Sequence, residues 1–168
     1  SPDGNEKLAR GRCEVRVGMA KVGTMKRRSC EVVEMSRRRK LDFCCLQETR
    51  RRGKGANVFG NNYKIFLSGC SKGTAGAGIL VDKKWIEKVL EVRRISERIM
   101  VLRVRVGKSV FSLVSVYAPQ VGREMEEKEE FFISLGKVIS AVDVNDRLMV
   151  SGDLNGHVGT KKDGFEGV

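Results

Sequence analysis

The segment Phe43–Thr49, FCCLQET, places four apolar residues in a row before an amide, a carboxylate and a hydroxyl. A run of this length is too short for a helix and is typical of a strand that is buried on both faces. Glu48 then lies at the carboxyl end of that strand, where α/β folds gather their functional groups. Its carboxylate can hold a hard cation such as Mg²⁺, which prefers oxygen ligands. The alternative is a carboxylate that ends the strand and pairs with a neighbouring arginine.

Further elements are predicted on both sides of this strand. Alternating apolar residues predict a first strand over 15–23, and Ser29 is suited to cap a helix over 30–39. Regular alternation around Gly107-Lys108 predicts a hairpin of strands 100–106 and 109–117. The remaining predictions are strands over 63–67, 78–81 and 148–150, and a helix over 124–142 that turns Phe131, Phe132, Leu135, Val138, Ile139 and Val142 to one face. Strands outnumber helices, which indicates a mixed α/β architecture with helices covering sheets.

A second acidic motif, Gly152–Asn155 (GDLN), follows the last predicted strand. Asp153 can orient or deprotonate a water, and Asn155 can donate a hydrogen bond to charge that develops on a phosphoryl group. The same residues also fit an Asx turn. The Tyr117 hydroxyl, at the end of the predicted hairpin, can bond a phosphate oxygen, or the residue can simply end its strand. His157, the single histidine, is interpreted as a loop residue.

Positive charge is concentrated in the first third of the chain. The formal net charge is +12, and residues 1–55 hold 16 Lys/Arg against 7 Asp/Glu, a net of +9. Part of this charge forms a basic, glycine-bounded loop over 50–55. Such a distribution fits a polyanionic partner, and the alternative is a solvated surface. Charge alone does not separate DNA from RNA or from an anionic membrane.

Other classes of function are excluded by what the sequence lacks. No run of about 18 apolar residues and no signal-peptide core occurs, so no membrane partner is expected. Five cysteines, an odd number, fit no zinc pattern, and they indicate a reduced intracellular compartment, nuclear or cytoplasmic. The glycine-rich segment Gly73–Gly78 leads into the apolar run Ile79–Val81 and not into a helix, so it is not a nucleotide-binding loop.

Five motifs, taken in order, resemble one family. They are 22–25 (VGTM), 45–50 (CLQETR), 78–81 (GILV), 116–119 (VYAP) and 151–156 (SGDLNG). The pattern is similar to that of the endonuclease/exonuclease/phosphatase superfamily and covers roughly residues 18–164. The amino-acid sequences of these motifs are most similar to those of endonuclease domains of non-LTR retrotransposons and of craniofacial development protein 2-like proteins. The Gln-Glu-Thr and Gly-Asp-Leu-Asn motifs at this separation are fairly specific, whereas the glycines between them are not.

The resemblance implies a DNase I-like, four-layer α/β sandwich, in which two mixed sheets pack face to face with helices outside. It implies hydrolysis of a phosphodiester in DNA, or alternatively RNA, by water activated on Mg²⁺, with Mn²⁺ as a possible substitute. It makes Glu48 the metal ligand, Tyr117 a phosphate contact and Asp153 the residue that positions the attacking water. Asn155 would stabilise the site. The basic-loop residues that it places beside the cleft, in contact with the nucleic-acid backbone, are Arg50, Arg51, Arg52 and Lys54.

Two features depart from the family pattern. Relatives carry Trp-Asn on the first strand, where the Asn helps to bind the metal, and Ala20 and Lys21 stand here instead. Lysine has three donors and no acceptor, so it cannot ligate Mg²⁺, and its charge would compete with a cation at Glu48. The family pattern also continues to a terminal Ser-Asp-His that this sequence does not contain. We therefore expect a mobile lead-in at 1–12 and a carboxyl-terminally truncated domain at 13–168.

The leading interpretation is an endonuclease-type domain of retrotransposon origin whose hydrolytic activity is impaired. One alternative is a non-catalytic relic that binds nucleic acid, and another is a phosphatase of the same fold. The basic loop and the wording of the motifs favour nucleic acid over the phosphatase. Truncation would also leave sheet edges exposed, so a partner or a downstream segment is expected to cover them.

Overall fold

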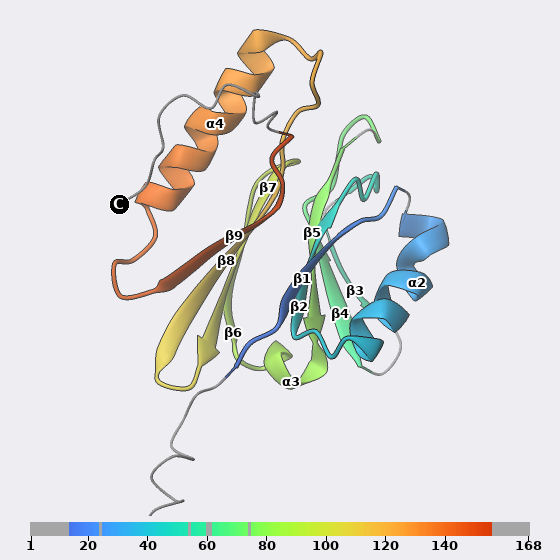
Figure 1. Ribbon diagram of the computed structural model, residues 1–168, viewed down its shortest axis with the longest axis vertical. Helices are drawn as coiled ribbons and strands as arrows, with labels where there is room; N and C mark the ends of the chain where they lie inside the picture. Colours follow the sequence, from blue (N-terminus) through green and yellow to red (C-terminus); the bar gives the residue numbers. More distant parts are fainter. Residues whose placement is uncertain (1–13, 24, 54, 60–61, 74, 156–168) are drawn as a thin grey trace, which may run out of the picture.

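The computed structural model describes residues 14–23, 25–53, 55–59, 62–73 and 75–155. The expected lead-in at 1–12, Lys54 of the basic loop and His157 lie outside these ranges. The described residues form two mixed β-sheets that pack face to face, with one long helix on each outer side (Figure 1). The four-layer α/β sandwich is thereby confirmed.

The first sheet is built around β2 (Phe43–Gln47). Its strand order is β1 (Val17–Lys21), β2, β5 (Ala77–Asp82), β4 (Tyr63–Leu67) and β3 (Gly55–Phe59). The first strand pairs in parallel with β2, and the other neighbours are antiparallel. All five residues of β2 are buried because the strand is covered on both faces. This burial explains why its first four residues are apolar without interruption.

The second sheet has the order β6 (Val89–Ser96), β7 (Ile99–Val106), β8 (Ser109–Tyr117) and β9 (Arg147–Asp153). The predicted hairpin is confirmed, with β7 and β8 paired without interruption from the turn at Gly107-Lys108 to the opposite end. The last strand pairs in parallel with β8. Each sheet therefore contains one parallel pair.

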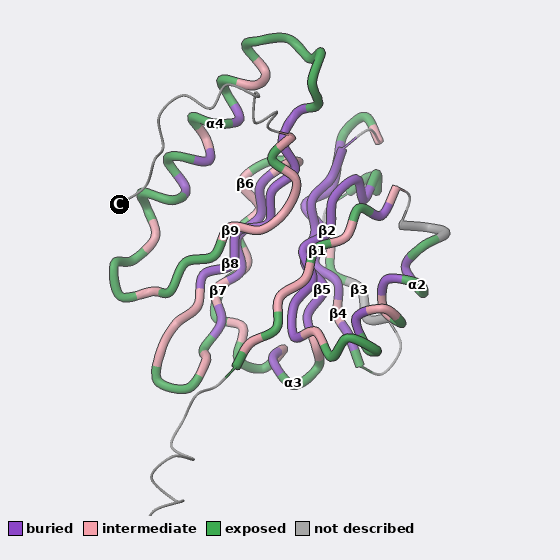
Figure 2. The backbone as a smooth tube through the Cα atoms, viewed as in Figure 1, coloured by how far each residue is buried: buried purple, intermediate pink, exposed green. Residues whose placement is uncertain are grey.

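Three apolar clusters fill the three interfaces between the four layers. Figure 2 shows that the buried residues are concentrated on the strands of the two sheets. Successive strand residues point to opposite faces, so Cys45 packs between the sheets while Cys44 packs under helix α2 (Met25–Arg38). Helix α4 (Met125–Ser140) covers the outer face of the second sheet. The buried residues between the sheets are Phe43, Cys45, Phe66, Ile79, Val81, Trp85, Met100, Leu102, Val104 and Leu113.

The structure corrects both predicted helices. Helix α2 begins at Met25, and Ser29 lies buried within it instead of capping it, because it shares the buried face with Val32 and Ser36 at helical spacing. Helix α4 buries Phe131, Leu135 and Val138, at spacings of four and three residues. Phe132 and Ile139, which were predicted on the same face, are exposed. Each follows a buried residue and is therefore rotated about a quarter turn away from the sheet.

The strands also differ from the prediction in extent. The first strand is confined to 17–21 and the last extends over 147–153. Strands β3 and β6 and the short helix α3 (Lys83–Ile86) were not predicted. Among the described residues, no helix combines the length and the apolar character needed to cross a membrane.

A buried carboxylate ties the start of β2 to its neighbours. Asp42 Oδ2 accepts a hydrogen bond from the backbone of Arg16 at 2.7 Å. Its Oδ1 accepts one from the Trp85 indole at 2.9 Å and pairs with the Lys84 ammonium at 2.7 Å. Asp42 thus links the chain before β1 to α3 at the end opposite the strand ends described next.

Candidate functional site

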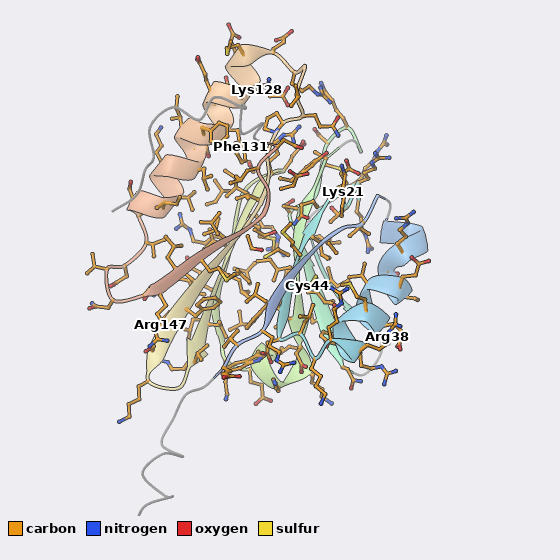
Figure 3. All side chains as sticks on the ribbon, in the orientation of Figure 1. Lys21, Arg38, Cys44, Lys128, Phe131 and Arg147 are labelled. Atoms are coloured by element: carbon orange, nitrogen blue, oxygen red, sulfur yellow. The ribbon has the colours of Figure 1, made fainter. Side chains whose placement is uncertain are left out.

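Polar side chains meet where the two parallel strand pairs end. Lys21 ends β1 and Glu48 follows β2, so both lie at the same edge of the first sheet. Tyr117 and Asp153 end β8 and β9, and they are register partners. The Tyr117 hydroxyl donates a hydrogen bond to Glu48 Oε1 over 2.8 Å, which joins the two sheets. The structure therefore brings the predicted residues Glu48, Tyr117 and Asp153 to one end of the sandwich, where Figure 3 labels Lys21.

The Glu48 carboxylate is surrounded by donors and positive charge. Lys21 Nζ lies 3.1 Å from Oε1, and the Arg50 guanidinium lies 3.7 Å from Oε2. The Gln120 amide also approaches Oε1, at 3.4 Å. The Glu48 side chain is only 7% exposed, whereas the Lys21 side chain is 52% exposed. The carboxylate is thus buried, and its main counter-charge reaches it from the solvent side.

These contacts fix the charge states of the site. Burial alone would raise the pKa of Glu48, but hydrogen bonds from Tyr117 and Lys21, and nearby positive charge, hold that pKa below its usual value. The hydrogen bond to Glu48 and its charge raise the pKa of Lys21, with a smaller contribution from Asp153. Burial and the neighbouring carboxylate raise the pKa of Tyr117, so its hydroxyl keeps its proton at neutral pH. The site therefore holds an ionised pair with a neutral phenol beside it.

The backbone of the site is unusual for residues with side chains. Glu48, Arg50 and Asn155 have φ values of 54°, 49° and 44°, in the left-handed region that costs energy outside glycine. The strand-end loop is held in this form because the backbone N–H groups of Thr49 and Arg50 donate to the carbonyls of Gly76 and Ala75, at 3.1 and 2.8 Å. Strained backbone that the surrounding fold enforces is typical of functional sites.

The second acidic motif forms a tight turn. The backbone N–H of Asn155 donates to Asp153 Oδ1 at 2.8 Å, which is Asx-turn geometry, and the Asn155 amide donates to the Ala118 carbonyl at 2.7 Å. Gly152 allows β9 to pack closely against Val116 of β8. Its φ is 138°, and a Cβ at this position would collide with the Val116 carbonyl. The turn interpretation is therefore confirmed. The hydrogen bond from the Asn155 amide joins the loop after β9 to the loop after β8, so this amide N–H binds a group of the protein itself.

The basic loop lies beside this end of the sandwich. Arg50 contacts Glu48, and the side chains of Arg51 and Arg52 are exposed. The loop is anchored because the Cys70 backbone N–H donates to the Arg51 carbonyl at 3.0 Å. Its described residues are thus presented on a fixed backbone next to the carboxylate.

Two residues of the site were missed by sequence reasoning. Gln120 lies 3.4 Å from both Glu48 Oε1 and the Tyr117 hydroxyl. Arg98 stacks over the Tyr117 ring, with 5.2 Å between guanidinium carbon and ring centre, and donates to the Tyr117 carbonyl at 3.1 Å. Arg98 could have been found, because the register of a hairpin that turns at Gly107-Lys108 places it opposite Tyr117. The contact of Gln120 depends on the fold of the loop after β8, which carried no such signal.

Solved structures share the fold that carries this site. The catalytic domain of Xenopus laevis APE2 matches with a TM-score of 0.67 at 13% identity, over 83% of this chain and 58% of its own. The endonuclease domain of TRAS1, a telomere-specific non-LTR retrotransposon, matches with a TM-score of 0.64 at 23% identity, over 86% and 60%. D. rerio TDP2 in complex with a single-strand DNA product matches with a TM-score of 0.62 at 13% identity, over 85% and 61%.

The chain has the endonuclease/exonuclease/phosphatase fold. The predicted resemblance is confirmed at the level of the fold, because structural similarity at these sequence identities shows the fold alone. The chain spans about three fifths of the length of the three solved structures. No protein-family model matches the sequence, and no curated protein matches it.

The residues present do not fit the metal that the endonuclease/exonuclease/phosphatase fold implies. No group of three or more His, Cys, Asp and Glu side chains suited to hold an ion occurs within the described ranges. At Glu48, the Lys21 ammonium lies 3.1 Å from Oε1, and lysine offers no lone pair to a metal at neutral pH. An Mg²⁺ ion at Glu48 would have to displace this ammonium and would face two positive side chains.

Proposed function

We propose that the chain is an endonuclease-type domain by descent that binds DNA and whose phosphodiester hydrolysis is impaired. The single observation that carries this proposal is the ion pair between Lys21 and Glu48. The Lys21 ammonium lies at the residue to which the family resemblance assigns a divalent ion. The fold is shared with the endonuclease domain of TRAS1 and with a TDP2 complexed with single-strand DNA. A site of this kind retains groups that meet a phosphate while it lacks the Lewis acid that would activate water.

The remaining groups of the site support binding more than turnover. The Lys21 ammonium and the Arg50 guanidinium both contact Glu48 and are both about half exposed, and we call this exposed part of the site the rim. A phosphodiester at the rim meets positive charge. Asp153 is the proposed residue for holding a water, through the carboxylate that also closes the turn to Asn155. Without a strong electrophile at the phosphate, positioning of a water accelerates hydrolysis little, since loss of one electrostatic group commonly lowers the rate by a factor of about 10²–10³.

DNA is the proposed ligand because of the charge and the fold together. The net charge of +12 and the exposed Arg51 and Arg52 supply contacts that any phosphate backbone can use. A solved structure with this fold, TDP2 of D. rerio, carries single-strand DNA. RNA is the alternative ligand, and competition between matched DNA and RNA strands would separate the two.

The test is the salt dependence of DNA binding. We expect Arg51→Gln/Arg52→Gln to lower the slope of log Kd against log salt by about 2, near one unit for each lost phosphate contact. The matched control is Lys108→Gln/Arg147→Gln, which removes the same charge from the opposite end of the second sheet. Equal slopes for the two double variants would refute the proposed binding face. Plasmid nicking with Mg²⁺ should stay near background, and robust nicking would refute impaired hydrolysis.

A further inference from the structure

Lys21 has more hydrogen-bonding capacity than its ion pair uses. A lysine ammonium carries three donors, and the Lys21 ammonium makes one short contact with Glu48 Oε1, at 3.1 Å. Half of the side chain is exposed, although its partner carboxylate is buried. The ammonium thus has one side on a buried anion and the other side toward solvent, which is the arrangement of a cation that bridges a protein carboxylate to an external anion.

The neighbours of Lys21 determine what such an anion would meet. The negative groups are Glu48 and Asp153, whose charges both raise the pKa of the lysine. The positive group is Arg50, on the other oxygen of the same carboxylate. The Tyr117 hydroxyl lies between the two sheets and donates to Glu48. Without Lys21, the rim would present two carboxylates and one arginine, and it would repel a phosphate.

We propose that Lys21 is a resident cation, which takes the place of a divalent ion and makes phosphodiester binding at this rim independent of metal. The proposal rests on the proposed DNA binding and deepens it. Its ligand is a phosphate of the nucleic-acid backbone, which the ammonium bridges to Glu48 through a donor that the ion pair leaves available. Because the ammonium is covalently tethered, chelators cannot remove it, whereas a site that depends on Mg²⁺ loses its cation in EDTA.

The experiment compares DNA affinity in EDTA and in Mg²⁺ at matched ionic strength. The unmodified chain should bind a short duplex with the same Kd in both buffers. Lys21→Asn should bind more weakly in EDTA, with a salt slope lower by about 1, and it should regain affinity in Mg²⁺, because an amide oxygen can ligate the ion. The matched control, Lys108→Asn, removes an exposed lysine at the opposite end of β8 and should show no response to Mg²⁺.

A second variant keeps the test decisive if Lys21→Asn does not fold, which a thermal unfolding curve would reveal. Lys21→Arg retains the cation, so the ratio of its two Kd values should stay near one whatever its absolute affinity. A ratio that shifts strongly toward Mg²⁺ would overturn the proposal.

The outcomes separate this proposal from the proposed function. If the unmodified chain binds no DNA in either buffer, DNA binding fails and the role of Lys21 fails with it. If the chain binds DNA only with Mg²⁺, or if Lys21→Asn behaves like Lys108→Asn, DNA binding stands and the resident cation is refuted. Metal-independent binding that becomes metal-dependent in Lys21→Asn supports both.

Discussion

Tyr117→Phe should destabilise the fold, because it removes the hydroxyl that joins the two sheets across the site. Tyr117 is 3% exposed and donates at 2.8 Å to the ionised Glu48. Hydrogen bonds to charged groups contribute about 1.5–3 kcal/mol. The loss should fall in the lower half of that range, since the carboxylate keeps Lys21 and Gln120 as partners. For a domain of this size, each kcal/mol moves the melting temperature by roughly 2–4 °C.

The other tyrosine provides a matched control. Tyr63 is also 3% exposed, and its hydroxyl donates at 3.1 Å to the backbone carbonyl of Leu41, an uncharged acceptor. A neutral hydrogen bond contributes about 0.5–1.5 kcal/mol, so Tyr63→Phe should cost less than Tyr117→Phe. Urea unfolding of both variants at neutral pH measures the difference directly. Equal losses, or a smaller loss for Tyr117→Phe, would mean that the charge of Glu48 adds nothing to the bond and would refute the reasoning.

Three further predictions concern the fold that carries the site. Burial alone would raise the pKa of Asp42, but its hydrogen bonds hold the pKa below the ordinary 3.8. A lowered folded-state pKa gives stability that is present above the unfolded value and lost as pH falls, so Asp42→Asn should flatten the decline of unfolding free energy below about pH 5, measured by urea titration. Gly152→Ala should cost more than 1 kcal/mol, since both its φ and the Val116 carbonyl exclude a Cβ, and chemical denaturation that shows a neutral change would contradict this. Phe131→Ala should cost about 3–5 kcal/mol, whereas Phe132→Ala, at a residue 51% exposed, should cost far less, and a reversed order in thermal unfolding would mean that α4 packs differently.

The elements that could be predicted are those in which the order of apolar and polar residues reflects which faces are buried. Strand β2 is buried on both faces and its first four residues are therefore all apolar, and the β7–β8 hairpin alternates regularly about its turn. Strands β3 and β6, which lie at sheet edges, were missed because neither shows a regular alternation of apolar residues. An edge strand is paired on one side only, and β6 carries Glu91, Arg93 and Arg94 among its apolar residues, which hides the alternation.

The candidate site was predictable where it depends on strand ends and unpredictable where it depends on loops. Glu48 follows β2 and Asp153 ends β9, and the parallel pairing of each strand places the end of its partner, at Lys21 and at Tyr117, beside it. The short contact between Lys21 and Glu48 could be anticipated for the same reason. The amide of Asn155 was expected to face a ligand, but it donates a hydrogen bond to the Ala118 carbonyl. This contact depends on the paths of two loops, which the spacing of apolar residues does not predict. Gln120 was missed on the same ground.

The Lys21–Glu48 pair also explains how a buried carboxylate is stabilised at this position in the fold. A carboxylate as buried as Glu48 is costly unless a counter-charge and hydrogen bonds satisfy it. The ammonium of Lys21 supplies that charge at 3.1 Å, a separation at which the Coulomb attraction is about 5 kcal/mol for an effective dielectric near 20. Exposure of the lysine reduces the net contribution to about 1 kcal/mol. The same ammonium that stabilises the buried carboxylate therefore repels a divalent ion that approaches it. Lys21→Asn alone reopens one oxygen ligand, but the Asn155 amide stays bonded to Ala118, so we expect metal binding to return more readily than hydrolysis.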